Sequence, residues 1–281
     1  DRVDVAALVG ASVELLGRSY PGVMSLAARH DGRQLLYTLR EDQAKTTSVW
    51  AYELSRDRST FVLRKDGPGP IVVPLADGRL AVPMADFTTV TYAASGLGEP
   101  EPLLDGVLLD TTPDGRFGLV FKPVKGFGGD TQLVCYDLEN DAVVGVVTDE
   151  WSLQHDMPHL SRDGRWTTFV TRRSGQEEAY VAPFPPTGEL WQASTDGAQG
   201  ALFGPDDASL YLLHGRSRST GLLRVERVAF GSEPEVSFGN PEPVFSYEGD
   251  PLSLSSFDPD TGTFLGAATF APQARALVIE T

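Results

Sequence analysis

The sequence predicts an all-β chain folded as a six-bladed β-propeller that is closed by its N-terminal strand. Three observations lead to this class: a short turn motif recurs along the chain, strand-length apolar runs follow each copy, and helical periodicity never extends far. The composition agrees, because 29 glycines and 20 prolines provide many turns and 41% hydrophobic residues provide a large core. We therefore expect a single domain over residues 1–281.

The repeated motif is an Asp-Gly-Arg turn with four intact and two degraded copies. A tight hairpin needs positive φ at its centre, which glycine adopts without steric cost and aspartate tolerates. The starting positions of neighbouring copies differ by 37 residues at the least (76 to 113) and by 54 at the most (204 to 258). This spacing is close to the roughly 40 to 50 residues of one propeller blade, so six turns predict six blades. The copies occupy residues 30–33, 76–79, 113–116, 162–165, 204–207 and 258–262.

Each turn is followed by an apolar, β-rich run and then by a second one. The first runs are expected to be strands at residues 34–39, 80–83, 117–121, 166–171, 209–213 and 263–270. The second are expected at residues 48–54, 88–94, 131–137, 178–183, 222–228 and 275–280, with outer strands at 61–64, 143–147 and 190–194. The resulting blades cover residues 17–64, 65–104, 105–148, 149–195, 196–246 and 247–281.

The two ends of the chain complement each other. The sixth repeat ends at Thr281 after its third strand, whereas residues 11–16 offer a strand before the first turn. An N-terminal strand that completes the last blade would close the ring and remove free sheet edges. The sequence therefore predicts that the N-terminal strand pairs with the C-terminal one.

Charge and cysteine content limit the possible partners. The formal charge of −16 makes this an acidic protein and argues against nucleic acid, which binds basic surfaces. No apolar run approaches the roughly 18 to 20 residues of a membrane helix, so we expect no membrane insertion within this chain. Cys135 lies in a strand-like run and is expected to be a buried small hydrophobic residue. The start at Asp1, without a basic and apolar leader, is expected of a mature form or of a piece of a longer protein.

The fourth and fifth repeats resemble a known family. Residues 158–166 read Pro-His-Leu-Ser-Arg-Asp-Gly-Arg-Trp, residues 179–185 read Ala-Tyr-Val-Ala-Pro-Phe-Pro, and residues 190–197 begin Leu-Trp-Gln-Ala-Ser. These motifs resemble TolB-like, WD-repeat-like propellers, in particular the extracytoplasmic C-terminal propellers of bacterial receptor-type serine/threonine kinases. The resemblance is specific over residues 154–213 and implies a non-catalytic sensory or protein-binding module, outside the cytoplasm, with any kinase lying beyond this chain.

Two positions depart from the pattern of that family. Arg162 stands where the family has proline, and residues 204–208 read Gly-Pro-Asp-Asp-Ala where a Ser-Pro-Asp-Gly turn is expected. These departures indicate that the two loops have drifted or have been adapted.

The usual catalytic motifs do not occur. There is no Gly-x-Ser-x-Gly nucleophile elbow, no Gly-x-x-x-x-Gly-Lys loop and no Cys-x-x-Cys pair. His155 and His159 are the most ligand-like pair, but on an extended strand they would lie about 13 Å apart, too far to chelate one metal ion. We therefore expect no enzyme activity, no metal and no cofactor, and place both histidines at the mouth of the central channel.

Basic residues gather in the loops between the second and third strands. Nine of the 23 lysines and arginines fall there: Arg40, Lys45, Lys122, Lys125, Arg172, Arg173, Arg216, Arg218 and Arg275. This segregation predicts a positive channel mouth that binds a protein, a peptide or a small anionic ligand. The alternative is that they are solvated hairpin tips, since acidic residues such as Glu177 and Glu178 share these loops. The candidate site consists of Asp110, His155, His159, Gln199, Lys125, Arg172, Arg173, Arg216 and Arg218.

Two other functions stay open. The chain could be a free-standing periplasmic TolB-like scaffold, or the propeller portion of a peptidase or lyase whose active-site residues are dispersed along the sequence. Fold alone does not decide between these, because propellers have many functions.

Overall fold

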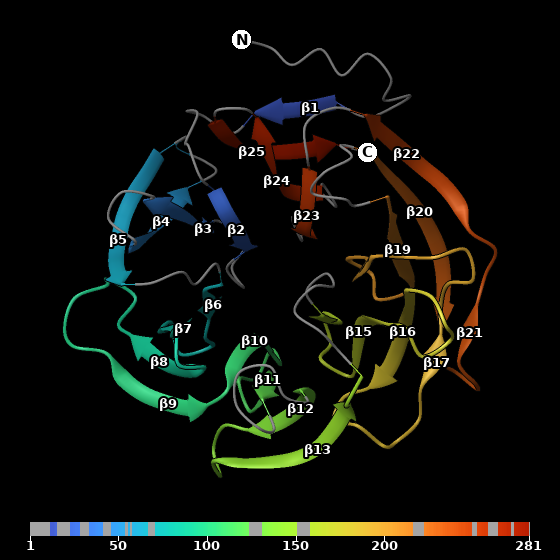
Figure 1. The fold of residues 1–281 in the computed structure, drawn as a ribbon, viewed down its shortest axis with the longest axis horizontal. Coiled ribbons are helices and arrows are strands. Elements are labelled where there is room, and N and C mark those ends of the chain that lie inside the picture. Colours follow the sequence, from blue (N-terminus) through green and yellow to red (C-terminus); the bar gives the residue numbers. More distant parts are fainter. Residues whose placement is uncertain are drawn as a thin grey trace. The chain divides into compact units, whose positions relative to one another are not determined.

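A computed structural model describes residues 12–15, 23–28, 34–41, 46–53, 56, 58–66, 71–123, 131–150, 158–215, 222–248, 252–257, 264–270 and 273–280. These residues contain no α-helix and form six sheets, five with four strands and one with five (Figure 1). The chain divides into two compact units. The first unit comprises Asp1–Asp105, Ser217–Leu222 and Tyr247–Thr281, and the second comprises Gly106–Arg216 and Leu223–Ser246.

The first unit holds three four-stranded antiparallel sheets. One contains β2 (Val23–Ala28), β3 (Gln34–Glu41), β4 (Thr46–Glu53) and β5 (Arg58–Asp66) in this order. The next contains β6 (Val73–Pro74), β7 (Leu80–Pro83), β8 (Thr88–Tyr92) and β9 (Glu101–Asp105). The third has the order β1 (Ser12–Leu15), β25 (Gln273–Glu280), β24 (Phe264–Phe270), β23 (Leu252–Phe257).

The predicted pairing of the two chain ends is confirmed in this third sheet. β1 runs antiparallel to β25, with Ser12 opposite Glu280 and Leu15 opposite Leu277. A strand from the start of the sequence therefore covers the outer edge of the last strand, which would otherwise be open to another chain.

The second unit also holds three sheets. The first contains β10 (Val107–Thr111), β11 (Phe117–Pro123), β12 (Thr131–Asp137) and β13 (Ala142–Thr148). The next contains β14 (His159–Leu160), β15 (Trp166–Thr171), β16 (Glu178–Pro183) and β17 (Trp191–Gln192). The last contains β18 (Gly200–Phe203), β19 (Ser209–His214), β20 (Leu222–Gly231) and β21 (Ser237–Phe238), and β22 (Glu242–Glu248) also pairs with β20. This sheet therefore has five strands, whereas the other five sheets have four.

In the second unit, the last strand of each sheet is more exposed than the strands before it. In the second unit, β10 lies beside β14 and β14 beside β18, so the first strands of successive sheets are neighbours. All four residues of β18 are buried, whereas β13 is mostly exposed. In the first unit, β2 lies beside β6 and β23 in the same way. This gradient is the one expected when first strands face an axis and last strands face solvent.

The repeated turns share one conformation in the four copies that the structure describes. The residue at the glycine position has positive φ, which is 86° at Gly78, 72° at Gly115, 72° at Gly164 and 53° at Asp207. Its N–H donates to the carbonyl three residues earlier, as from Gly164 to Ser161 at 2.9 Å. The preceding aspartate accepts the N–H of the residue after the glycine position, as Asp163 does from Arg165 at 2.9 Å. The physical reason given for the motif is therefore confirmed. The first and last copies lie outside the described residues.

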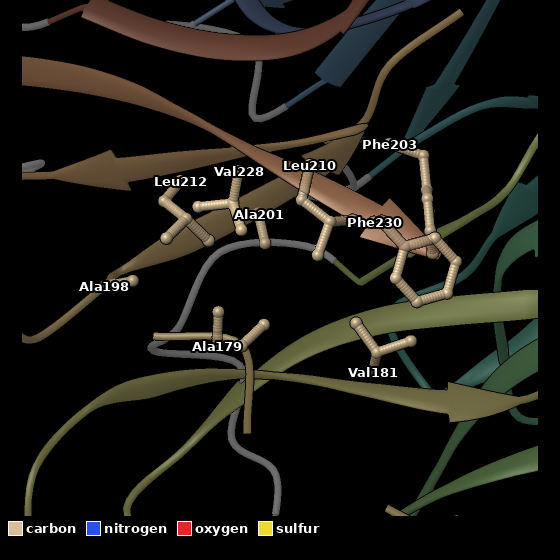
Figure 2. Packing of buried hydrophobic residues seen from close by; sticks show 10 residues of the cluster. Ala179, Val181, Ala198, Ala201, Phe203, Leu210, Leu212, Val228 and Phe230 are labelled. Atoms are coloured by element: carbon tan, nitrogen blue, oxygen red, sulfur yellow. The ribbon is translucent and has the colours of Figure 1, made fainter. Parts of the chain in front are cut away.

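A continuous apolar core joins the fourth and fifth repeats. Ala179 and Val181 of β16 meet side chains of β18, β19 and β20, among them Leu210 and Phe230 (Figure 2). Trp166 and Phe230 pack edge to face with their ring centroids 5.3 Å apart. Burial of this apolar surface fixes the two sheets against each other.

Candidate functional site

A polar cavity of about 510 Å³ opens at one end of the fourth and fifth repeats. The loop after β15 supplies one wall, and the segment before β18, the end of β19 and the start of β20 supply the other. The lining residues are Arg172, Gly175, Gln176, Glu177, Asp196, Gly197, Gln199, His214, Gly215 and Arg224.

The buried carboxylate of Glu178 holds both walls of the cavity. This side chain is 1% exposed at the first position of β16. It accepts hydrogen bonds from Gln176 Nε2, from Ser194 Oγ and, at 3.1 Å, from the N–H of Gly197. Because a buried carboxylate needs such donors, these contacts fix the positions of Gln176 and Gly197. Glu178 begins β16, as the strand expected over residues 178–183 has it, and its side chain is buried, so it does not belong to the solvated hairpin tips of the alternative interpretation.

His214 ends β19 and its side chain is buried beside the cavity. Its Nδ1 contacts the carbonyl oxygen of Gly197, and its Nε2 lies 3.2 Å from Glu226 Oε2. If Nδ1–H donates to the Gly197 carbonyl, the neutral imidazole has only a lone pair at Nε2 to present to Glu226. An ion pair with Glu226 therefore requires the imidazolium form. His214 thus links the Gly197 segment to β20.

The cationic side chains at the cavity are paired with carboxylates. Arg172 Nη2 lies 2.7 Å from Glu177 Oε1, and Arg224 Nη2 lies 3.2 Å from Asp196 Oδ2. Arg224 Nε is also 3.5 Å from Glu226 Oε1. The side chains of Arg172 and Asp196 are 70% and 85% exposed, so both signs of charge are accessible. The walls therefore present mixed charge rather than a uniformly positive surface.

Two of the predicted site residues, Arg172 and Gln199, line this cavity. Gln199 Oε1 is buried and has no hydrogen-bond partner among the described residues, while its N–H donates to Leu213 at 2.8 Å. Arg173 points to another carboxylate, with its Nε 3.2 Å from Glu150 Oε2. The predicted site residues His155, Lys125, Arg216 and Arg218 lie outside the described part of the chain.

Asp110 connects two first strands instead of lining the cavity. Its Oδ1 accepts the N–H of Thr111 at 2.8 Å, and its Oδ2 accepts the N–H of Leu160 at 3.0 Å. Because Leu160 belongs to β14, this carboxylate fixes β10 against β14.

His159 is likewise not among the residues that line the cavity. Its Nε2 is buried and has no hydrogen-bond partner among the residues described. Burial lowers the pKa of His159 to about 4, because the charged imidazole would lose its hydration. His159 is therefore a neutral side chain at neutral pH.

Acid is expected to destabilise the protein through His159. Between pH 6.5 and about 4 the imidazole binds a proton in the unfolded chain but not in the folded one, so stability falls as the pH falls through this range. The loss reaches up to about 3 kcal/mol below pH 4. Denaturant unfolding of the wild type and of His159→Gln at several pH values measures this effect. The variant should show a shallower decline, and parallel declines would contradict the assignment.

Several residues of the cavity were not singled out from the sequence. Asp196, His214 and Arg224 come from three different segments, and no motif spacing connects them. For Glu178 the sequence did contain one indication of burial, because this residue directly precedes the apolar run of β16.

The described residues contain no group of three or more His, Cys, Asp or Glu side chains that could hold a metal ion, and no helix long and apolar enough to cross a membrane. Cys135 is buried, and burial together with Asp137 raises the pKa of its thiol to about 12. As expected, Cys135 is a buried and unreactive side chain.

No protein-family model and no curated protein sequence matches this chain. Solved structures, in contrast, are similar to it. A putative TolB from Agrobacterium tumefaciens aligns with a TM-score of 0.67 at 15% identity, covering 96% of this chain and 97% of that one. TolB from Acinetobacter baumannii aligns with a TM-score of 0.58 at 16% identity over 88% of this chain, which spans 65% of that protein.

An oligogalacturonate lyase from Vibrio parahaemolyticus also aligns, with a TM-score of 0.57 at 9% identity, covering 97% of this chain and 94% of that one. Identities this low establish the fold and nothing more. The predicted all-β propeller fold, similar to that of TolB structures, is therefore confirmed.

Proposed function

We propose that this chain is a non-catalytic propeller that binds a ligand or protein at the cavity of the fourth and fifth repeats. The observation that carries the proposal is the cavity itself, an open polar site where two sheets meet and where Arg172 and Asp196 are accessible. Ligand sites are concave, and convergent polar groups fix the orientation of what binds there.

The six sheets are proposed to be the blades of one ring over residues 1–281. The pairing of β1 with β25 and the neighbouring first strands within each unit support this arrangement. Such a ring would be the single domain expected from the repeat.

The ligand is proposed to be a protein or peptide segment that carries both charges, in preference to a small anion. Each guanidinium at the cavity already has a carboxylate partner, so a simple anion would have to displace Glu177 or Asp196. A peptide with a free amino end and a free carboxyl end can pair with both members of such ion pairs.

We further propose that the propeller is the extracytoplasmic sensor part of a larger bacterial receptor-like protein. The support is the resemblance of residues 158–166, 179–185 and 190–197 to receptor-kinase propellers. A free-standing periplasmic scaffold is the alternative, and the coding sequence upstream of Asp1 distinguishes the two.

Saturation-transfer NMR with pools of short peptides tests the ligand proposal. Peptides with free ends are expected to bind, while the same pools with acetylated and amidated ends bind several-fold more weakly. Arg172→Glu should abolish binding, because it removes the guanidinium and places a second carboxylate beside Glu177. Arg227→Glu is the matched control, because Arg227 lies outside the cavity lining. Its Nη2 is 4.0 Å from Asp206 Oδ2, so this variant also places a second carboxylate beside an existing one. Equal binding by both variants, or equal binding of inorganic phosphate and free peptides, would exclude the proposal.

A catalytic propeller is the second candidate. His214 and Glu226 provide an acid-base pair beside the cavity, and one protein of similar fold is named as an oligogalacturonate lyase. Incubation with oligogalacturonate, followed by the ultraviolet absorbance of an unsaturated product, tests this alternative. Product that is formed by the wild type and lost in His214→Gln would replace the binding proposal.

A further inference from the structure

Successive turns of the second unit meet at equivalent positions. Each turn has five positions, occupied by residues 112–116, 161–165 and 204–208 in the third, fourth and fifth repeats. The fourth position of one turn contacts the early positions of the turn before it. Two such junctions are described, and they are built differently.

The junction of the third and fourth turns joins glycine to proline. A Cβ atom on Gly164 would lie 2.8 Å from Pro113 Cδ and 3.1 Å from Thr112 Cγ2. A side chain at the fourth position is therefore incompatible with proline at the second position of the preceding turn.

The junction of the fourth and fifth turns joins Asp207 to the backbone of Arg162 and Asp163. Asp207 Oδ1 accepts the N–H of Arg162 at 2.7 Å, and Asp207 Oδ2 accepts the N–H of Asp163 at 2.8 Å. Both oxygens of one carboxylate are thus used on a turn more than 40 residues away, which gives two charge-assisted hydrogen bonds. Proline at position 162 would have no N–H to donate.

We infer that Arg162 and Asp207 are a matched pair that replaces the proline and glycine of the preceding junction. The sequence departs from the family pattern at both positions, and the structure brings the two departures into direct contact. Asp207 adopts φ of 53°, which aspartate tolerates better than most residues. The pair converts an apolar contact between two sheets into a hydrogen-bonded link.

The link lies at the far ends of two strands that lead to the cavity. β15 begins after the fourth turn and ends just before Arg172, and β19 begins after the fifth turn and ends at His214. The link therefore joins the same two sheets that form the cavity walls. The link holds these sheets together whichever ligand the cavity binds.

A double-mutant cycle tests the pair by thermal unfolding. Arg162→Pro is expected to lower the melting temperature by about 5 to 10 °C, because it removes one donor and places a ring against Asp207. Asp207→Gly is expected to cause a smaller loss, because it removes both hydrogen bonds but relieves the positive φ. The double variant recreates the Pro–Gly junction and should be more stable than Arg162→Pro alone. Pro113 and Pro205 hold the same turn position, so proline fits the backbone there.

Arg162→Ala is the matched control, because it keeps the N–H and removes only the exposed side chain. It should leave the melting temperature and the slow amide exchange of residues 162 and 163 unchanged, whereas Asp207→Gly should accelerate that exchange. Additive losses in the double variant would overturn the inference. So would a loss in Arg162→Ala as large as that in Arg162→Pro.

Discussion

Gly96→Ala is expected to lower the free energy of unfolding by more than about 3 kcal/mol. Gly96 lies in the loop between β8 and β9 with φ of 70°, a conformation that favours glycine. A Cβ atom there would lie 1.9 Å from the carbonyl oxygen and 2.6 Å from the carbonyl carbon of Val62 in β5. Because these are backbone atoms of a paired strand, they cannot move aside without distorting the sheet.

Gly98→Ala is the matched control for this prediction. Gly98 has φ of 94° in the same loop, but a Cβ atom on it would meet no other atom within 4 Å. This variant should lose only about 1 kcal/mol, the cost of an alanine at positive φ. Denaturant unfolding of both variants gives the comparison, and equal losses would show that the contact with β5 is not responsible.

Removal of residues 1–16 is expected to lower the free energy of unfolding by about 2 to 4 kcal/mol. The truncation removes β1 and leaves the outer edge of β25 without the partner that it has from Leu277 to Glu280. An edge freed in this way also invites pairing with another chain, so association should rise with protein concentration.

A shorter truncation isolates the contribution of β1. Removal of residues 1–11 retains Ser12–Leu15, so the difference in melting temperature between the two truncations measures the strand itself. Sedimentation at several concentrations follows the association. Identical melting temperatures for the two truncations would contradict a stabilising role of the β1–β25 pair.

The strands and turns could be predicted from the sequence because their causes are local. The strands β12, β15 and β16 begin and end at the residues expected from the apolar runs. The Asp-Gly-Arg turn follows from the positive φ at its glycine and from the N–H that its aspartate accepts, as at Gly115 and Asp114. Even the pairing of β1 with β25 followed from a missing strand at one end and a spare strand at the other.

The candidate site could not be predicted in the same way, because its residues meet only after the sheets pack. Glu178 was expected in a strand, but the donors that hold its buried carboxylate lie up to 19 residues away in the chain. Arg172 was expected to contribute positive charge, yet it is paired with Glu177 in the same loop. Whether a loop arginine is free or paired depends on side-chain geometry, which residue types and spacing do not specify.

The all-β class, the repeat and its turns follow from the sequence, since each depends on backbone conformations that neighbouring residues impose. Which polar groups face each other depends on how the sheets pack. Hydrogen bonds and ion pairs act over about 3 Å, and the contacts of Asp207 with Arg162 and of Glu178 with Gly197 require two packed sheets to bring the groups within that distance. The two departures from the repeat, at positions 162 and 207, could be seen in the sequence, but the reason for them could be seen only in the fold.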